Sequence, residues 1–562
     1  MRLHSRPRFT WRALPAALLV TALLVPPAFG GQAPGAAAKP AATLSAAERE
    51  AAARVKAETI REVTTRLASK EMEGRGTGQP GADRAARYIA DRFAKLGLKP
   101  LGDAGAYLQA IKFRDSQVLP ESSVKAGDAM LKLGDDFVLA PPYGTEPVDV
   151  TGGLVLAGYG VTSEELKRDD LAGLDVKGKV VMLLGGRPKN AEPALWTKVA
   201  GRQAVLGALV KNGAAAIILL NIEATGQSYA MIANYLSRRR VALAGAPPPP
   251  IKMPPIIIVS SSGAEKLFSG TGATLAQVIE KAQSGENVSR DLNKTASLSL
   301  KLKNEETTSS NVVGLLEGAD PRLKDQAVIY TAHYDAYGIE ADGRIYPGAA
   351  DNALGVGMML AIAEAFATTP ARPRRSVIFL AVTGEEYGLL GANYWVNHPT
   401  WPLEKLAADL NFDGIGTEVY GPVKRVVGFG AEHSELGAVM EDVVAATGNV
   451  VMPDPMPEER AFYRSDHFAF VRKGVPALML LGAPEGDAGV LLARARKWLE
   501  TDYHQPTDTV RPDWNWDGPR TSAVIGLLIG MRVAAADQGP KWLPSSPFYT
   551  DRGTGATTPA VK

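Results

Sequence analysis

Two stretches of the sequence decide the fold: VIYTAHYD at residues 328–335 and SVIFLAVTGEE at residues 376–386. Each begins as an apolar run rich in β-branched and aromatic residues and ends in polar or acidic side chains, as buried strands do where they enter a loop. The apolar stretch 353–366 between them has the length of a helix. The sequence therefore predicts a strand, a helix and a second strand in succession, the repeating pattern of an α/β sheet.

The same alternation of strand and helix patterns extends outward from this centre. Further strands are expected at 410–412 and 475–481, with a helix at 433–448 between them. We therefore expect an α/β fold with a mixed, mostly parallel central sheet and helices on both faces. In such sheets, ligands bind at the carboxyl ends of the strands.

The composition excludes several classes of protein. The chain has 562 residues, of which 46% are hydrophobic and 22% charged, ordinary values for folded protein and unlike those of collagen, coiled coils or disordered chains. Without residues 1–30, which hold four arginines and no acidic residue, 58 basic and 60 acidic residues leave a net charge of −2. This balance offers no basic surface, so no nucleic-acid partner is expected. The absence of cysteine excludes disulfides, thiolate metal ligands and a cysteine nucleophile.

The N-terminus predicts export. Four arginines between positions 2 and 12 precede an apolar run at 13–25, and small residues follow at 28, 30 and 31. We interpret residues 1–30 as a signal peptide and 31–46 as a flexible linker, which implies a periplasmic or secreted protein. The rival interpretation is a membrane anchor, but the apolar run is shorter than the ~20 residues needed to span a bilayer. No stable membrane span is expected once the signal peptide is removed.

Changes in composition and hydrophobic pattern divide the rest of the chain. The expected parts are an N-terminal extension at 47–147, a separate small β-rich domain at 148–304, the α/β domain at 305–550 and a disordered tail at 551–562. Within the β-rich part, residues 284–304 are polar and alternating, which indicates an edge strand or an exit linker. The glycine-rich turn 74–78 lacks the Lys-Ser/Thr pair of a phosphate-binding loop, so we interpret it as a plain loop.

Polar side chains follow three of the predicted strands. His333 and Asp335 follow the first strand, Glu385 and Glu386 the second, and Asp413 the third. If these strands are parallel, their ends meet at one edge of the sheet and the side chains can converge. A single histidine or aspartate after a strand is usually a capping or turn residue, and adjacent glutamates usually lie solvated on the surface. In extended backbone, however, neighbours point to opposite faces, so one glutamate can bind a metal while the other faces its bound water.

Five motifs follow one another along the second half of the chain. They are His333-x-Asp335, Gly348-Ala349-Ala350-Asp351-Asn352, Gly384-Glu385-Glu386, Asn411-x-Asp413 and His504-x-x-x-Asp508-Thr509. In this order they resemble the motifs of the co-catalytic zinc peptidases of clan MH, a group with secreted bacterial aminopeptidases, glutamate carboxypeptidase and the catalytically silent transferrin receptor. The resemblance covers about residues 309–536, and 464–477 is similar to the loop and strand before the last metal ligand in many members.

The resemblance implies a centre with two Zn²⁺ ions. Asp351 resembles the carboxylate that bridges both ions, His333 and Asp413 would complete one site, and Glu386 and His504 would complete the other. Each ion then has three protein ligands and an open position for water, as catalytic zinc requires. Sites made of nitrogen and oxygen ligands also accept other divalent ions, such as cobalt or manganese.

Three further residues gain roles from the resemblance. Glu385 is the expected general base, which takes a proton from the water between the metals, leaving a bridging hydroxide, and later returns it to the leaving amine. Asp335 is expected to orient the imidazole of His333. Tyr503 is a candidate hydrogen-bond donor to the oxyanion, with simple packing as its alternative role. The peptide bond after Asp351 is often cis in the family.

The predicted function is an exported di-zinc exopeptidase that acts on peptides. An aminopeptidase is favoured, because a free α-amine can interact with the acidic groups beside the metals. The alternatives are a carboxypeptidase or a glutaminyl cyclase-like enzyme on the same site, or a non-catalytic receptor-like binding protein, in which the ligands are typically lost. A carboxypeptidase needs cations for the terminal carboxylate. Arg464 and the run Arg238–Arg240 are candidates, although we expect the run to be solvated on the surface.

Two other stretches are interpreted in the same way. Residues 148–304 resemble the protease-associated domain inserted in several members of the family, on the glycine and apolar patterns of 154–160, 176–184 and 203–220. This resemblance implies a domain that shields the cleft and helps to select substrates. Ser465-Asp466-His467 has the letters of a serine-hydrolase triad, but three adjacent residues cannot form that relay. We expect this segment to be a wall of the substrate cleft.

Overall fold

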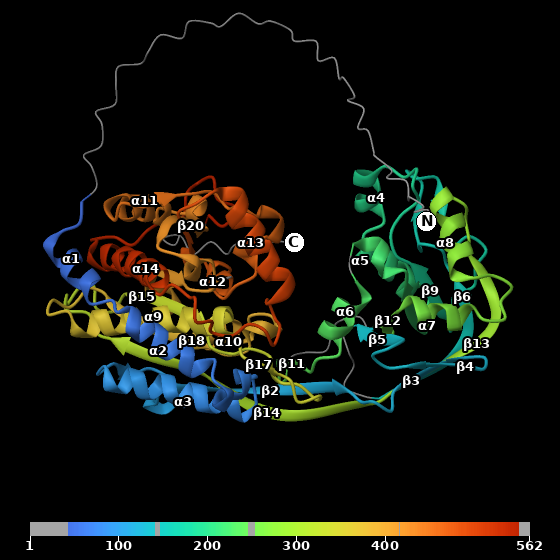
Figure 1. Ribbon diagram of the computed structural model, residues 1–562, viewed down its shortest axis with the longest axis horizontal. Helices are drawn as coiled ribbons and strands as arrows, with labels where there is room; N and C mark the ends of the chain where they lie inside the picture. Colours follow the sequence, from blue (N-terminus) through green and yellow to red (C-terminus); the bar gives the residue numbers. More distant parts are fainter. Residues whose placement is uncertain (1–42, 141–146, 227, 246–252, 415, 550–562) are drawn as a thin grey trace, which may run out of the picture. The chain divides into compact units, whose positions relative to one another are not determined.

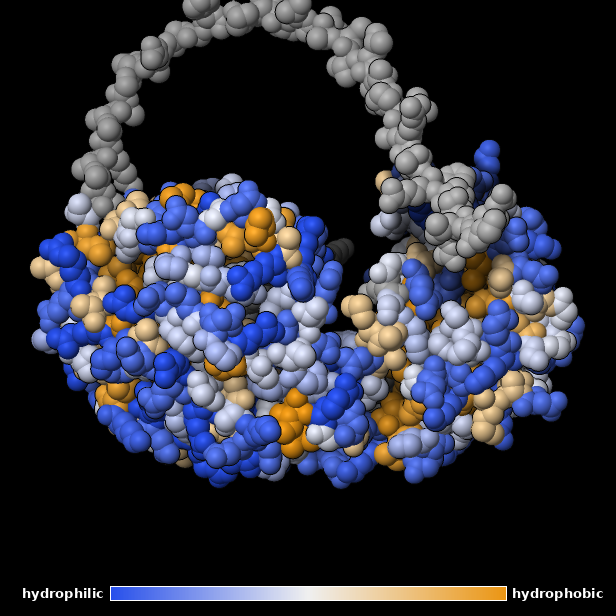
Figure 2. Space-filling view, viewed as in Figure 1, coloured by the Kyte–Doolittle hydropathy of each residue, from blue (hydrophilic) through white to orange (hydrophobic). Residues whose placement is uncertain are grey.

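The computed structural model describes residues 43–140, 147–226, 228–245, 253–414 and 416–549 (Figure 1). The predicted signal peptide, most of the predicted linker and the predicted tail lie outside these ranges. Among the described residues, one segment, Ala349–Thr368, is long and apolar enough to cross a membrane, but 94% of its apolar window is buried inside the protein. On the face seen in Figure 2, hydrophilic residues predominate and apolar residues form small groups.

The larger sheet has ten strands within the described ranges. In spatial order they are β11 (Arg240–Leu243), β2 (Leu108–Val118), β14 (Leu302–Leu316), β18 (Ser376–Val382), β15 (Ala327–His333), β19 (Leu406–Asn411), β22 (Ala477–Pro484), β20 (Val423–Phe429) and β21 (Val450–Val451), with β1 (Lys99–Pro100) paired to β14. The central strands β18, β15, β19 and β22 are parallel, whereas β14 and β20 pair antiparallel at either side. The mixed α/β fold is confirmed, and its parallel part lies at the centre.

Helices cover both faces of this sheet. They include α9 (Leu354–Thr368) and α14 (Asp517–Ala535) on one face, and α10 (Leu390–Asn397) and α12 (His467–Val471) on the other. Tyr330 of β15 lies in the apolar core with α9 and α14, and its neighbour Ile329 lies in the core with α10 and α12. Because successive strand residues face opposite sides, the apolar run of β15 is buried on both faces, as a central parallel strand requires.

Three N-terminal helices belong to the larger sheet's core. They are α1 (Ala46–Ala53), α2 (Ala57–Leu67) and α3 (Pro80–Lys95). Helix α2 packs against α9, and Phe93 of α3 contacts the ring of Phe379 in β18 at 6.2 Å between centroids. This packing brings the loop between α2 and α3 to the edge of the sheet, where Gly76 forms a bridge with Ala336.

The smaller sheet has eight strands in the described part of the chain and a separate apolar core. In spatial order they are β4 (Ala129–Lys132), β3 (Ser123–Ala126), β13 (Arg290–Leu300), β6 (Val148–Leu156), β9 (Val180–Leu184), β10 (Ala216–Leu220), β12 (Ile256–Val259) and β5 (Phe137–Ala140). The expectation of an edge strand within 284–304 is wrong, since β13 pairs with β3 on one side and β6 on the other. The strands β3, β4 and β5 lie before residue 148, and β3 is the second partner of β13. The division into separate domains stays a prediction.

Candidate metal centre

The carboxyl ends of the central strands meet at one edge of the larger sheet. His333 is the last residue of β15, and Asp413 lies two residues beyond β19. Glu386 lies in a 3₁₀ turn just after β18. Asp351 precedes α9, and His504 follows α13 (Ala488–Thr501). The structure brings these five residues together, although they are far apart in the sequence.

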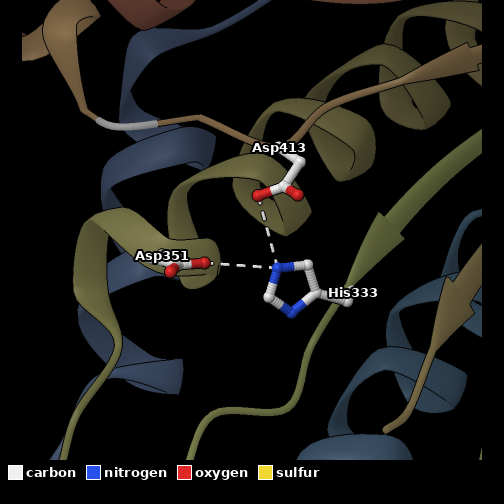
Figure 3. A group of neighbouring side chains, drawn as sticks. All are labelled: His333, Asp351 and Asp413. Carbon is white, nitrogen blue, oxygen red and sulfur yellow. Dashed lines mark hydrogen bonds and ion pairs between the residues drawn. The ribbon is translucent and has the colours of Figure 1, made fainter. Parts of the chain in front are cut away.

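The first group consists of His333, Asp351 and Asp413 (Figure 3). The Nε2 atom of His333 lies 3.3 Å from Oδ1 of Asp351 and 3.3 Å from Oδ1 of Asp413. The imidazole is fully enclosed, whereas the carboxylate of Asp413 is 16% exposed. One ring nitrogen and two carboxylate oxygens thus face a common point at the edge of solvent.

The second group consists of Asp351, Glu386 and His504. Nε2 of His504 lies 3.2 Å from Oδ2 of Asp351 and 2.9 Å from Oε2 of Glu386. Asp351 belongs to both groups, and its two oxygens face different histidines. A carboxylate in this position has the geometry to bridge two cations.

The donor atoms fit divalent cations. In each group, the imidazole nitrogen and the carboxylate oxygens lie within 4.8 Å of one another, and this set of donors suits zinc as well as other divalent metals. The side chain of Glu386 is only 2% exposed, and its Oε2 faces Nε2 of His504 at 2.9 Å without a well-aligned hydrogen bond. A buried carboxylate oxygen that is poorly paired is costly, and a bound cation would satisfy it.

The electrostatics of the cluster favour added positive charge. Burial lowers the pKa of His333, but the carboxylates of Asp413 and Glu385 outweigh it and raise that pKa well above its usual value. Burial also opposes protonation of His504, but Glu386 and Asp351 raise its pKa to about 9. Burial acts to raise the pKa of Asp351, yet hydrogen bonds with both imidazoles hold it below its usual range. A divalent cation would supply the positive charge that these carboxylates attract.

Hydrogen bonds to its backbone hold the loop that carries Asp351. Asp508 accepts hydrogen bonds from the N–H groups of Ala350, at 2.9 Å, and of Asp351, at 3.0 Å. The side-chain amide of Asn352 donates to the carbonyl of Phe412 at 2.8 Å. The Asp351–Asn352 peptide bond is cis, as the resemblance implied. These contacts give Asp508, the aspartate of the motif His504-x-x-x-Asp508-Thr509, a role in holding Asp351.

Glu385 and Glu386 face different groups. Both lie in a 3₁₀ turn rather than in the extended backbone that we expected, because Gly384 reverses the chain at a φ of +74°. Oε2 of Glu385 lies 4.0 Å from Nε2 of His333, whereas Glu386 faces His504. Burial raises the pKa of Glu385 well above its ordinary value. Glu385 is therefore positioned to accept a proton beside the first group.

Asp335 supports the first histidine mainly through its backbone. Its carbonyl oxygen lies 3.2 Å from Nδ1 of His333, whereas its carboxylate oxygen Oδ1 lies 3.7 Å away. Oδ1 also accepts a hydrogen bond from the N–H of Glu385 at 3.2 Å. Asp335 thus links the orientation of His333 to the turn that carries Glu385.

Tyr503 packs directly on the second histidine. Its ring stacks on His504 with 3.6 Å between centroids, and its hydroxyl oxygen accepts a hydrogen bond from Nη2 of Arg464 at 3.3 Å. The hydroxyl hydrogen remains available to a ligand. Both roles that we considered, packing and hydrogen-bond donation, are compatible with this position at the cleft.

The loop 74–78 does more than the plain loop that we expected. Arg75 is fully buried, and its guanidinium donates hydrogen bonds to the carbonyls of Leu67, Tyr334, Pro347 and Gly348. Burial lowers its pKa to about 10. Thr77 donates a hydrogen bond from Oγ1 to Oδ2 of Asp335 at 3.1 Å. A charged residue between glycines was the available signal, but nothing in the local pattern indicated burial.

The expectation of a solvated run at Arg238–Arg240 is wrong for its first two members. Arg238 and Arg239 are 4% and 5% exposed, because α6 (Tyr229–Leu236) and β11 direct them toward the larger sheet. Arg464 does line the cleft, but its guanidinium is paired with Glu459 at 3.0 Å.

The Ser465-Asp466-His467 segment forms no catalytic relay. Ser465 lines the cleft and accepts a hydrogen bond from Nδ2 of Asn411 at 2.6 Å. Asp466 and His467 are fully buried, and no hydrogen bond joins the side chains of the three residues in the part of the chain that the structure describes. Burial lowers the pKa of His467 to about 3.

A cleft adjoins the first group, with Asp351 and Asp413 in its lining. Its polar lining includes Asp351, Glu385 and Asp413. Its apolar lining consists of Phe429, Met456, Ala461, Met479, Leu481 and Leu499, with Pro455 beside them. The cleft therefore combines an acidic end with a mainly apolar wall.

Residues 311–526 match the family model described as peptidase family M28. Among curated proteins, the probable leucine aminopeptidase 2 of Aspergillus oryzae is 32% identical over 189 residues, which are 33% of this chain and 36% of that protein. Aminopeptidase YwaD of Bacillus subtilis is 31% identical over 151 residues, which are 26% of this chain and 30% of that protein. The chain thus spans about a third of the length of these relatives.

Two solved structures share the fold over most of the chain. The aminopeptidase from Aneurinibacillus sp. strain AM-1 aligns with a TM-score of 0.56 at 18% identity, over 87% of this chain and 97% of that chain. The zinc aminopeptidase BSAP from Bacillus subtilis aligns with a TM-score of 0.51 at 18% identity, over 84% of this chain and 94% of that chain. At these identities the likeness is one of fold.

Proposed function

We propose that this chain, whose residues 311–526 match peptidase family M28, is a zinc-dependent aminopeptidase that removes N-terminal residues from peptides. The observation that carries the proposal is the position of Asp351, whose two carboxylate oxygens face two separate imidazoles. The family match and the zinc aminopeptidase BSAP of the same fold support zinc as the metal.

We propose that the centre holds two zinc ions. His333 and Asp413 would bind one ion, Glu386 and His504 the other, and Asp351 both. Bound there, the ions would polarise the scissile carbonyl and lower the pKa of an attacking water. Three carboxylates among these five residues offset most of the charge of two divalent cations.

The chain's own residues would move the proton. Glu385 lies beside the first group, 4.0 Å from His333, and burial raises its pKa, which makes its carboxylate a stronger proton acceptor. It would take a proton from the attacking water and return it to the leaving amine. Tyr503, held by Arg464 and by its stack on His504, would donate a hydrogen bond to the oxyanion.

The lining of the cleft favours an aminopeptidase over a carboxypeptidase. Asp454 adds a carboxylate to those of the cluster, and such a lining attracts a free α-amine. The candidate cations for a terminal carboxylate are already engaged, since Arg464 pairs with Glu459 and Arg238 and Arg239 are buried. The apolar wall suits a medium or large apolar N-terminal side chain.

Two further elements of the proposal concern the rest of the chain. We propose that residues 1–30 direct export to the periplasm or beyond the cell, on the basis of their basic and apolar segments. We also propose that the smaller sheet is part of a protease-associated domain that restricts access to the cleft. If the domain restricts access to the cleft, the enzyme should cleave long peptides more slowly than short ones, and a comparison of the two rates tests this second proposal.

Assays on matched substrates test the main proposal. Aminoacyl anilides with a free α-amine should be cleaved, with leucyl or phenylalanyl derivatives preferred, and the same compounds with an acetylated amine should not. Hydrolysis confined to peptides with a free carboxyl end would instead identify a carboxypeptidase. Cyclisation of N-terminal glutamine would identify the glutaminyl cyclase alternative, and zinc binding without turnover of any of these would identify a binding protein.

A further inference from the structure

The turn between α6 and β11 carries a buried cation to the second group. The guanidinium of Arg238 lies 4.2 Å from the ring centre of Tyr337 and 4.6 Å from that of Tyr346. Its Nη2 donates a hydrogen bond to the backbone carbonyl of His504 at 2.6 Å. Nε and Nη1 have no hydrogen-bond partner among the described residues, so the aromatic faces replace such partners. Buried cation–π contacts of this kind are stabilising.

The hydrogen bond from Arg238 supports an unfavourable backbone conformation at His504. Its φ is +57°, a left-handed conformation that is unfavourable for a residue with a side chain. The hydrogen bond from Arg238 to the His504 carbonyl fixes this conformation. Asn234 of α6 adds a second contact, from its Nδ2 to Oε1 of Gln505 at 3.3 Å. The segment that contains α6 therefore holds the chain on both sides of the peptide bond after His504.

The imidazole of His504 is held through Tyr337. The tyrosine hydroxyl lies 3.2 Å from Nδ1 of His504, and the two rings meet edge to face with centroids 4.9 Å apart. Since Nε2 faces Asp351 and Glu386, a metal-binding tautomer carries its proton on Nδ1 and donates it to Tyr337. Arg238 lies over the ring of this tyrosine, so it supports both the backbone and the ring partner of His504.

We propose that Arg238 is a positioning residue for the metal group of Asp351, Glu386 and His504. The inference rests on the proposed function, because it assumes that this group holds a cation. It makes retention of that cation depend on a segment of the chain outside the residues that match the peptidase family. Partners of metal ligands typically change metal affinity by about 10–100-fold when they are removed.

The neighbouring arginines offer a comparison. Arg239 binds elsewhere, with its Nη2 2.5 Å from the carbonyl oxygen of Thr77 and 2.8 Å from Oδ2 of Asp115. Arg240 donates to the carbonyl of Tyr235 at 3.2 Å and lies over that residue's ring. Arg240→Met therefore removes an equal charge from the first residue of β11, away from His504, and is the matched control.

Competition for zinc with a chromogenic chelator tests the inference. The full chain should show two zinc affinities, and Glu386→Gln and Asp413→Asn should identify which affinity belongs to which group. Arg238→Met should lower the zinc affinity that Glu386→Gln identifies as that of the second group by about 10–100-fold. The zinc affinity of the first group should be unchanged. Arg238→Lys keeps a cation over the tyrosines and should lose less. Arg240→Met should match the unmodified protein.

Two results would overturn the inference: unchanged zinc affinities in Arg238→Met, or an equal loss from both groups. If Arg238→Met does not fold, Tyr337→Phe decides, because it removes only the hydroxyl beside Nδ1. Selective loss in Tyr337→Phe would support the inference, and two unchanged affinities would overturn it. Failure of the unmodified protein to bind zinc would instead contradict the proposed function.

Discussion

Asp508 holds Asp351 by its backbone across 157 residues of sequence, with its Oδ2 3.0 Å from the Asp351 nitrogen. Its other oxygen accepts from the N–H of Ala350 at 2.9 Å. Burial raises the pKa of Asp508 to about 7, while the two backbone donors stabilise its charged form. The orientation of the carboxylate that belongs to both metal groups therefore depends on this contact.

Asp508→Ala should weaken zinc binding in both groups. Because Asp351 is shared, loss of its support should lower both affinities, by about 10-fold or more. Chelator competition measures both values in one titration. Loss from one group alone would show that Asp508 supports a single ligand rather than the shared carboxylate.

Glu385→Gln should lower turnover strongly without loss of zinc. The amide keeps the size of the side chain but cannot accept the proton, which should lower kcat by about 10²–10⁴-fold. Steady-state assays and metal analysis on the same preparation provide the measurement and its control. Activity near that of the unmodified enzyme would assign the general base to another residue.

Arg75→Met should destabilise the fold strongly. The substitution leaves the carbonyls of Leu67, Pro347 and Gly348 without their buried donor, and unpaired buried polar groups cost about 1–3 kcal/mol each. The free energy of unfolding in urea should fall by more than about 3 kcal/mol.

Arg84→Met is the matched control for that measurement. Arg84 forms an exposed ion pair with Glu73 at 2.6 Å, and such pairs contribute about 0–1 kcal/mol. Equal effects of the two substitutions would contradict the role assigned to Arg75.

Glu418 should make stability fall as the pH rises. Burial raises its pKa from 4.5 to about 7, so the folded protein binds this proton more tightly than the unfolded chain does. The stabilisation is complete below about pH 4.5 and is lost between that pH and 7, which amounts to about 3 kcal/mol.

Glu418→Gln should remove this part of the pH dependence. The glutamine can still accept the hydrogen bond from the N–H of Gly482, which is 2.9 Å long in the unmodified protein. Urea unfolding at pH 5 and pH 7.5 gives the comparison. An equal loss of stability over this range in both proteins would refute the assignment.

The sequence predicted the parts of the site that follow strands. His333, Glu386 and Asp413 end apolar runs that prove to be central parallel strands, and parallel strands bring such ends to one edge. Asp351 and His504 lie in connections without a periodic pattern. Only the resemblance placed them near the others.

Other features could not be predicted because distant contacts decide them. Arg75 and Arg238 are buried by residues about 260 positions away in the sequence, so local polarity suggested the opposite. The sequence did not show that the short strands β3 and β5 belong to the smaller sheet, because their partners β13 and β12 lie more than 100 residues later. Tertiary packing, rather than local pattern, determines these features.

Zinc content measures the central claim most directly. The unmodified chain, saturated with zinc and freed of excess ion, should retain two equivalents. Glu386→Gln and Asp413→Asn should each retain one, and Asp351→Ala should retain none, because its carboxylate serves both groups. A chain that retains a single equivalent, or an Asp351→Ala protein that still retains two, would contradict the account.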